Sequence, residues 1–143
     1  MFKFGDASKK RLDTCHRDLQ AICNEVIRYI DFSVLEGARS LETQQKYFRD
    51  GKTKIDGINK ISKHQHFPSM AVDIAPYPID FRNVSKSKAR FYFLAGMMYQ
   101  ASEDLYRKGL ISHKLRWGGD WDGDKEFYDQ SFDDLPHFEL VVV

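Results

Sequence analysis

The chain has few cysteines, no long apolar run and almost no excess charge, and each shortage excludes a class of protein. Two cysteines in 143 residues give no sign of a zinc–thiolate site. No apolar run approaches the ~20 residues of a membrane span, and the N-terminus lacks the apolar core of a signal peptide. A formal net charge of +1 gives no electrostatic reason to bind nucleic acid or an anionic membrane. We therefore expect a protein made in a cytoplasm, with neither membrane insertion nor nucleic acid as partner.

The composition is that of a folded protein. Apolar residues make up 42% of the chain and aromatic residues 14%, enough for a real core. We expect a single domain over residues 1–143 and a monomer. Cys15 and Cys23 are eight residues apart in a helical pattern, about 12 Å along a helix, which is too far for a disulfide. Both are predicted to be buried thiols.

Apolar spacing predicts the order of helices and strands. Spacings of three and four predict helices at residues 8–30, 41–50 and 89–108, and apolar runs or alternation predict strands at 31–38, 70–74, 113–117 and 137–143. Ser40 is predicted to cap the second helix, and Ser85 or Ser87 the third. This order predicts an α+β domain with a small, mostly antiparallel sheet flanked by helices.

The stretch Ser62–Pro78 places two histidines ahead of Asp73, which lies in an apolar run. Burying a carboxylate there is costly unless a positive charge neutralises it. A zinc ion bound by His66 and Asp73 would supply that charge, and His137 is a candidate third ligand. Asp134, three residues before His137, could then accept a proton from a metal-activated water, which is the chemistry of amide hydrolysis.

Other residues have simpler interpretations. His64 and His66 could also be an ordinary pair in a polar loop. His16 and His113 have no carboxylate pattern of this kind and are expected to be structural. Arg39 lies between a predicted strand and a predicted helix, where sites are often built, although a surface arginine is the alternative.

Carboxylates alternate in Asp120-Trp-Asp122-Gly-Asp124, which suggests a cation such as Ca²⁺. The run lacks the sixth-position glycine and the twelfth-position glutamate of an EF-hand. A solvated acidic loop and a different kind of cation loop both remain as interpretations.

Four ordered motifs together resemble the zinc D-alanyl-D-alanine peptidase family, which includes VanY-like carboxypeptidases and the L-alanyl-D-glutamate endopeptidases of phage endolysins. They are Gly37-Ala-Arg-Ser40, His66-Phe-Pro-Ser-Met-Ala-Val-Asp73, Arg116-Trp-Gly-Gly-Asp-Trp121 and Asp134-Leu-Pro-His-Phe-Glu139. The family pattern is Ser-x-His-x-x-Gly-x-Ala-x-Asp, followed by an acid three residues before a second histidine. The resemblance extends over nearly the whole chain.

The resemblance implies a role for each matched residue. His66, Asp73 and His137 would be zinc ligands, and Asp134 the general acid and base. Arg39 would bind the substrate or stabilise the negative carbonyl oxygen. A further implication is that Glu139 orients a ligand histidine.

The choice of His66 rests on spacing. The family's histidine is seven residues before its aspartate, as His66 is before Asp73, whereas His64 would be nine before it. The family's serine, however, stands two residues before the histidine, and Ser62 stands two before His64. The sequence analysis gives more weight to the histidine–aspartate spacing and so selects His66.

The implied function is that of a phage endolysin with a hedgehog/DD-peptidase-like fold. It would be a zinc peptidase that hydrolyses the L-Ala–D-Glu bond of the peptidoglycan stem peptide, and would act on the cell wall after release from the host cytoplasm. One alternative is a D-Ala-D-Ala carboxypeptidase. Another is a non-catalytic, zinc-stabilised binding module, because hedgehog domains share this fold, although such a module would not need Asp134.

Overall fold

An antiparallel four-stranded sheet organises the computed structural model, which describes residues 1–80, 82–128, 130 and 133–143. The strand order is β1-β2-β4-β3. The strands are β1 (Phe32–Glu36), β2 (Ala71–Pro76), β3 (Lys114–Gly118) and β4 (Asp134–Val141). The helices are α1 (Asp6–Leu12), α2 (Arg17–Val26), α3 (Leu41–Arg49), the 3₁₀ helix η1 (Lys63–Gln65) and α4 (Val84–Arg107). The predicted α+β class with an antiparallel sheet is confirmed.

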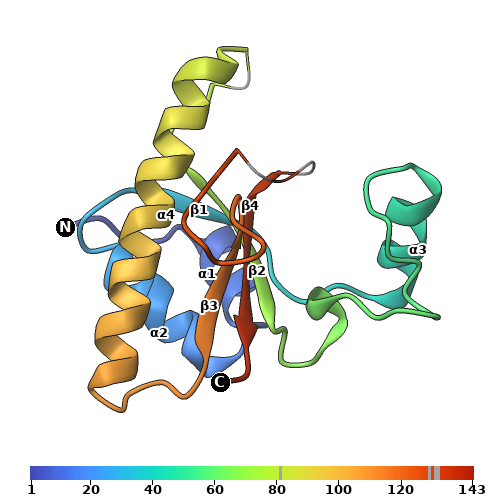
Figure 1. Cartoon of the computed structure of the whole chain (residues 1–143), viewed down its shortest axis with the longest axis horizontal. Coiled ribbons are helices and arrows are strands. Elements are labelled where there is room, and N and C mark those ends of the chain that lie inside the picture. Colours follow the sequence, from blue (N-terminus) through green and yellow to red (C-terminus); the bar gives the residue numbers. More distant parts are fainter. Residues whose placement is uncertain (81, 129, 131–132) are drawn as a thin grey trace.

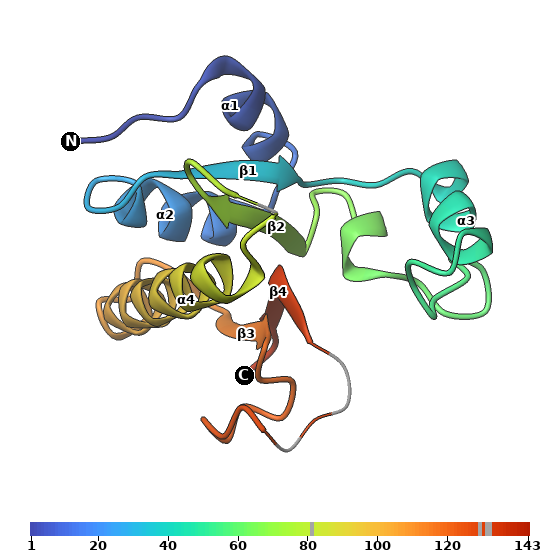
Figure 2. The ribbon, with the colours of Figure 1, turned by 90° about the horizontal axis from the view of Figure 1, so that it is seen from above.

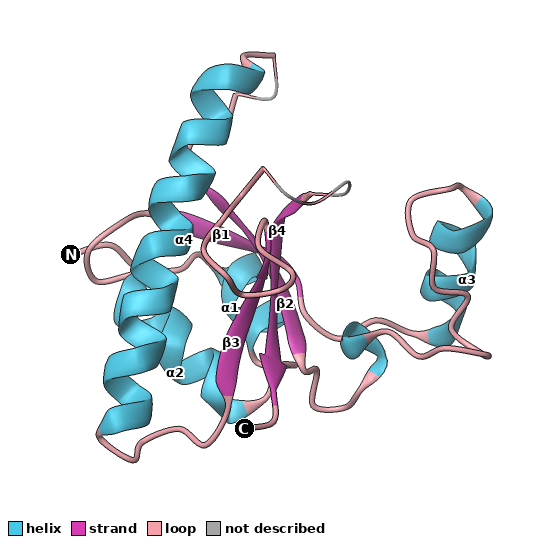
Figure 3. Cartoon of the chain, viewed as in Figure 1, coloured by secondary structure: helices cyan, strands magenta, loops and turns pink. Residues whose placement is uncertain are grey.

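The helices divide between the two sides of the sheet. Figures 1 and 2 show α2 and α4 side by side along one side, while α3 stands away from the sheet on the other side, next to η1. Figure 3 shows loops on both sides of α3: a short connection from β1, residues 37–40, and a longer one to η1, residues 50–62. Apolar side chains from α2, α4 and the strands form the core, among them Leu19, Ile22, Cys23, Ile74, Leu94, Met98, Trp117 and Leu140. In the described part of the chain, no helix is both long and apolar enough to cross a membrane.

The single helix predicted over residues 8–30 is wrong, because α1 and α2 are separate helices. Between them the chain leaves the helix to pair with Ser69, whose N–H donates to the Thr14 carbonyl and whose carbonyl accepts from the His16 N–H. The imidazole Nδ1 of His16 then accepts from the Asp18 N–H and caps α2. Apolar periodicity continues across the break because both helices face the core, so the spacing alone did not reveal it.

The structure also tests the predicted helix caps and the predicted state of the cysteines. Ser40 caps α3 as predicted, its hydroxyl accepting from the Thr43 N–H. The cap of α4 is Asn83, not Ser85 or Ser87, so this helix begins earlier than expected. Both cysteines are buried free thiols, as predicted.

The last strand begins at Asp134, three residues before the predicted start at His137. Its first residue pairs with Gly118 at the end of β3, after an irregularity in the register. The Trp117 indole N–H donates to the Leu135 carbonyl at 2.7 Å and holds the added residues against β3. Asp134 and His137 therefore lie on one strand.

Gly118 is required for this placement, and its substitution is a direct test. A Cβ at position 118 would lie 2.1 Å from the Asp134 carbonyl oxygen, so Gly118→Ala must displace the backbone that carries Asp134. We expect a destabilisation of about 1–3 kcal/mol, measured by urea unfolding, together with loss of any activity that depends on Asp134. The matched control is Gly96→Ala in α4, where nothing lies within 4 Å and alanine should stabilise the helix by about 1 kcal/mol. Equal stability of the two variants would contradict this interpretation.

Candidate metal centre and active site

Three polar residues form a row across the sheet. Asp73 on β2 is directly opposite His137 on β4 and also opposite Glu36 on β1. Residues paired in this way lie on the same face of a sheet with their side chains in reach of each other. Between Val34 and Glu36 the register shifts, and such a bulge re-aims a side chain. The bulge brings Glu36 to the face that holds Asp73.

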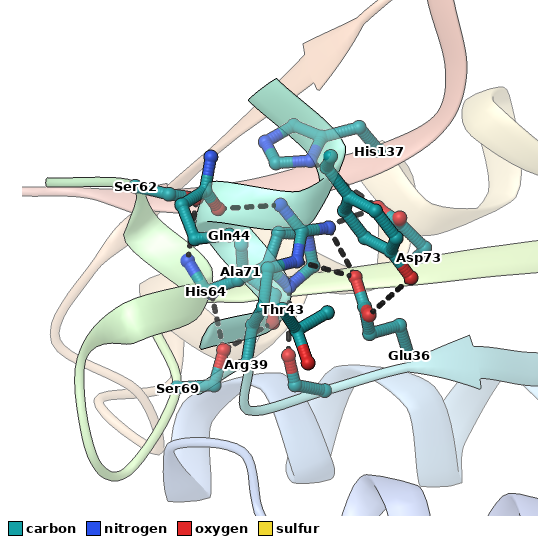
Figure 4. A network of polar contacts seen from close by, with 12 residues as sticks. Glu36, Arg39, Thr43, Gln44, Ser62, His64, Ser69, Ala71, Asp73 and His137 are labelled. Carbon is teal, nitrogen blue, oxygen red and sulfur yellow. Dashed lines mark hydrogen bonds and ion pairs between the residues drawn. The ribbon is translucent and has the colours of Figure 1, made fainter. Parts of the chain in front are cut away.

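His64 completes this group from a turn outside the sheet. The Ser62 hydroxyl accepts from the His64 N–H, and the Ser62 N–H donates to the Gln65 side chain, which together form a capping box. The turn directs the His64 side chain inward, where it is 2% exposed. Figure 4 shows His64 beside Asp73 and His137.

The structure places His64, rather than the predicted ligand His66, beside Asp73 and His137. His66 follows η1 and is exposed. Among the described residues, His64, Asp73 and His137 form a group whose potential ligand atoms all lie within 4.8 Å of one another. The two extra residues between His64 and Asp73 lie in the turn and loop before β2, so they do not disturb the strand. Ser62, two residues before His64 as in the family pattern, was the sequence signal for the histidine that lies in this group.

The hydrogen bonds of the two imidazoles leave one nitrogen of each directed at Asp73. Nδ1 of His64 lies 2.7 Å from the Gly37 carbonyl oxygen and must donate to it, which leaves Nε2 without a proton in the neutral ring. In His137, Nε2 lies 2.8 Å from Glu139 Oε1 and is the donor there. The other nitrogens, His64 Nε2 and His137 Nδ1, each lie 3.2 Å from Asp73 Oδ1.

This arrangement fits a metal ion. Two imidazole nitrogens and a carboxylate are a common zinc ligand set, and here their potential ligand atoms lie within 4.8 Å of one another. Without a metal, a proton on His137 supplies the positive charge. Burial lowers the pKa of His137, but its hydrogen bonds with Asp73 and Glu139 outweigh burial and raise that pKa to about 9. For Asp73, burial alone would raise the pKa, but the hydrogen bonds and charges of His137 and His64 outweigh burial and hold that pKa below its usual range. A metal entering the group must therefore displace a proton.

A second layer of contacts holds His137 in place. Glu139, two residues along β4, accepts from its imidazole and also from Arg116 Nη2 at 2.7 Å. Burial raises the pKa of Glu139, but these two hydrogen bonds outweigh it and keep the carboxylate ionised. A carboxylate behind a ligand histidine fixes the ring orientation and makes the facing nitrogen more basic. Arg116 is a contributor that the sequence analysis did not assign.

Arg39 lies two residues before the start of α3, in a network of polar contacts. Its guanidinium donates to Glu36 and, at 2.8 Å, to Gln44, and it packs on the Tyr47 ring at 4.8 Å. The Arg39 N–H donates to the His64 carbonyl at 2.7 Å, so the arginine and the histidine are fixed relative to each other. Figure 4 shows this network. Arg39 is therefore a half-buried cation that is oriented by its hydrogen bonds.

Asp134 is half-buried at the start of β4. Burial raises its pKa and the charge of Asp73 raises it further, while His137, His64 and Arg39 act in the opposite direction. The net shift is upward, which favours a carboxyl group that must both accept and donate a proton.

The acidic loop also forms a group, made of Asp120, Asp122 and Asp124. Asp120 is fully buried, and its Oδ1 has no hydrogen-bond partner among the described residues. Burial raises the pKa of Asp120; Lys125 acts in the opposite direction, and the carboxyl groups of Asp122 and Asp124 add to the rise. The neighbouring Trp121 ring lies 5.4 Å from that of His137, so this loop adjoins the candidate metal centre.

Comparison with known proteins matches nearly the whole chain. The sequence pattern of the family described as phage L-alanyl-D-glutamate peptidase matches residues 1–141. The chain belongs to this family. It is 28% identical to the L-alanyl-D-glutamate peptidase of Escherichia phage T5 over 148 residues, which cover 98% of each chain. Its fold is similar to that of the Serratia marcescens L-Ala D-Glu endopeptidase ChiX, with a TM-score of 0.66, 25% identity and coverage of 97% of this chain and 90% of that one.

The position of His64 beside Asp73 predicts that alanine variants of His64 and His66 will have different metal contents. We expect His64→Ala to abolish tight zinc binding, because one of the three converging nitrogen and oxygen donors is lost. His66→Ala removes an exposed side chain outside the group and should leave the zinc content at the wild-type value. Metal content is measured by mass spectrometry after dialysis against a weak chelator. If only the His66 variant loses zinc, His66 rather than His64 is the ligand.

Proposed function

We propose that this protein is a zinc-dependent endolysin that hydrolyses the L-Ala–D-Glu bond of the peptidoglycan stem peptide. The phage T5 and Serratia relatives are named for peptidases that act on this bond. The catalytic proposal is carried by two imidazole nitrogens that each lie 3.2 Å from the half-buried Asp73 carboxylate, at a site whose further carboxyl group, Asp134, has a raised pKa. Its place of action is the cell wall, after release from the host cytoplasm.

His64, Asp73 and His137 would hold the zinc ion. When bound, zinc polarises the scissile carbonyl and makes water a strong nucleophile near neutral pH. The residues around it keep the site in order: Gly37 and Glu139 fix the two imidazole tautomers, and Arg116 fixes Glu139.

Asp134 moves the proton in this proposal. Its carboxylate takes a proton from the attacking water and later gives it to the leaving amine, which its raised pKa favours. Arg39 provides a fixed positive charge at the same site. Glu36 and Gln44 engage three of its five N–H groups among the described residues, and the others are available to a substrate oxygen.

Asp134→Asn tests the proton transfer. The amide has the shape of the carboxylate but cannot accept the proton, so we expect kcat to fall by about 10²–10⁴-fold while zinc content stays unchanged. The release of soluble stem peptides from purified peptidoglycan measures the rate. Asp133→Asn, at the exposed neighbouring position, is the matched control and should retain full activity. Full activity in the Asp134 variant would exclude the proposed role of this residue, whereas no release of stem peptides by the wild type would favour a non-catalytic zinc-stabilised module.

The scissile bond is identified by the ends of the products. Mass spectrometry of digested peptidoglycan should show new D-Glu N-termini and new L-Ala C-termini. Release of a terminal D-Ala instead would identify the alternative, a D-Ala-D-Ala carboxypeptidase.

We also propose that Asp120, Asp122 and Asp124 bind a cation such as Ca²⁺. Support comes from the buried Asp120 oxygen without a partner among the described residues, since buried charges are normally paired or bind metals. Because Trp121 contacts the His137 ring, an ordered loop would steady the zinc centre.

Calcium dependence is testable in the zinc-loaded enzyme. Added Ca²⁺ should raise the melting temperature of the wild type, and Asp120→Asn should remove this response. Asp104→Asn, an exposed helical position away from the loop, is the control and should keep the response. Equal responses of wild type and Asp120→Asn would exclude the site.

A further inference from the structure

A second group of two histidines and an aspartate lies outside the candidate active site. It consists of His16, Asp18 and His113, and their potential ligand atoms lie within 4.8 Å of one another. His16 and Asp18 belong to the start of α2, whereas His113 immediately precedes β3, 95 residues from Asp18. The tertiary fold alone brings these three side chains together, and none of them belongs to the catalytic group.

The distances suit a single ion. His113 Nδ1 lies 2.8 Å from Asp18 Oδ2, and His16 Nδ1 lies 3.9 Å from Asp18 Oδ1. The two imidazole rings meet edge to face with their centroids 4.9 Å apart. Ligand atoms at about 2.1 Å from one zinc ion lie roughly 3–4 Å from each other, so small side-chain rotations suffice to coordinate it.

The carboxylate in this group is buried, and its two oxygens differ. Asp18 is 2% exposed, and its Oδ2 accepts from the backbone N–H groups of Ser112 and His113. Oδ1 faces His16 and the exposed Arg17 side chain at 3.9 Å each. Oδ2 thus anchors the segment before β3, and Oδ1 is the carboxylate oxygen nearer to the His16 imidazole.

The imidazoles are reachable from solvent, their side chains being 22% exposed in His16 and 18% exposed in His113. Two contacts compete with an ion: His113 Nδ1 is hydrogen-bonded with Asp18 Oδ2 at 2.8 Å, and His16 Nδ1 accepts the capping N–H of Asp18 at 3.0 Å. Binding through either Nδ1 would exchange its hydrogen bond for a metal–nitrogen bond. We therefore expect weaker binding here than at the catalytic group, where both facing nitrogens are directed at Asp73.

We propose that His16, Asp18 and His113 form a second transition-metal site that binds zinc and joins the start of α2 to the start of β3. Two imidazoles and a carboxylate select Zn²⁺ and similar ions over Ca²⁺ or Mg²⁺. Since the bound ion connects two distant segments, its effect is on stability rather than on the reaction.

The test is zinc stoichiometry, measured by calorimetric titration of the metal-stripped full-length protein with zinc chloride. Wild type should bind two ions per chain, one tightly and one more weakly. His113→Gln keeps a hydrogen-bonding side chain beside Asp18 but is a poor zinc ligand, and should bind only the tight ion while retaining peptidase activity. His66→Gln, which changes an exposed histidine outside both groups, is the control and should bind two.

The His64→Gln variant separates this proposal from the proposed function. It should lose the tight ion and its activity but retain the weak ion, and zinc should still raise its melting temperature. The double variant His64→Gln/His113→Gln should bind none. A folded His64→Gln protein, verified by circular dichroism, that binds no zinc would overturn the second site whatever the activity of the wild type. So would a His113→Gln protein that still binds two ions.

Discussion

The structure depends on one half-buried carboxylate, Asp73, and on how its charge is balanced. Apolar residues of β2 surround it in sequence, and two imidazole nitrogens face it at 3.2 Å. A carboxylate in such a place is costly without a positive partner, and both imidazoles donate their other N–H elsewhere. A metal ion or a proton must therefore complete the group. This requirement connects the packing of the sheet to the chemistry of the site.

Two kinds of support hold the site together. His137 and Asp73 lie on paired strands, so the register of the sheet fixes their separation. His64 and Arg39 lie on connections outside the sheet, where no strand pairing fixes them. Two hydrogen bonds hold these connections together instead: the His64 ring donates to the Gly37 carbonyl, and the Arg39 N–H donates to the His64 carbonyl. Gly37 itself has no room for a side chain, since a Cβ would lie 2.4 Å from the Arg11 carbonyl oxygen.

The sequence was a good guide wherever local chemistry decides the outcome. The alternation of His137 and Glu139 predicted that they share a face, and Glu139 does contact the His137 ring. The cap at Ser40 followed from residue type. Prediction failed where a tertiary contact overrides periodicity, as at the break between α1 and α2, where the chain pairs with Ser69.

The ordered motifs by themselves determined the family, the α+β class and the donor types of the candidate metal centre, because these depend on residue identity and order along the chain. Only the tertiary structure decided which histidine faces Asp73. His64 and His66 are two residues apart, and the direction of each side chain depends on a 3₁₀ turn held by Ser62 and Gln65. The group around Asp18 was likewise invisible in the sequence, since its members meet only when β3 is placed against the start of α2.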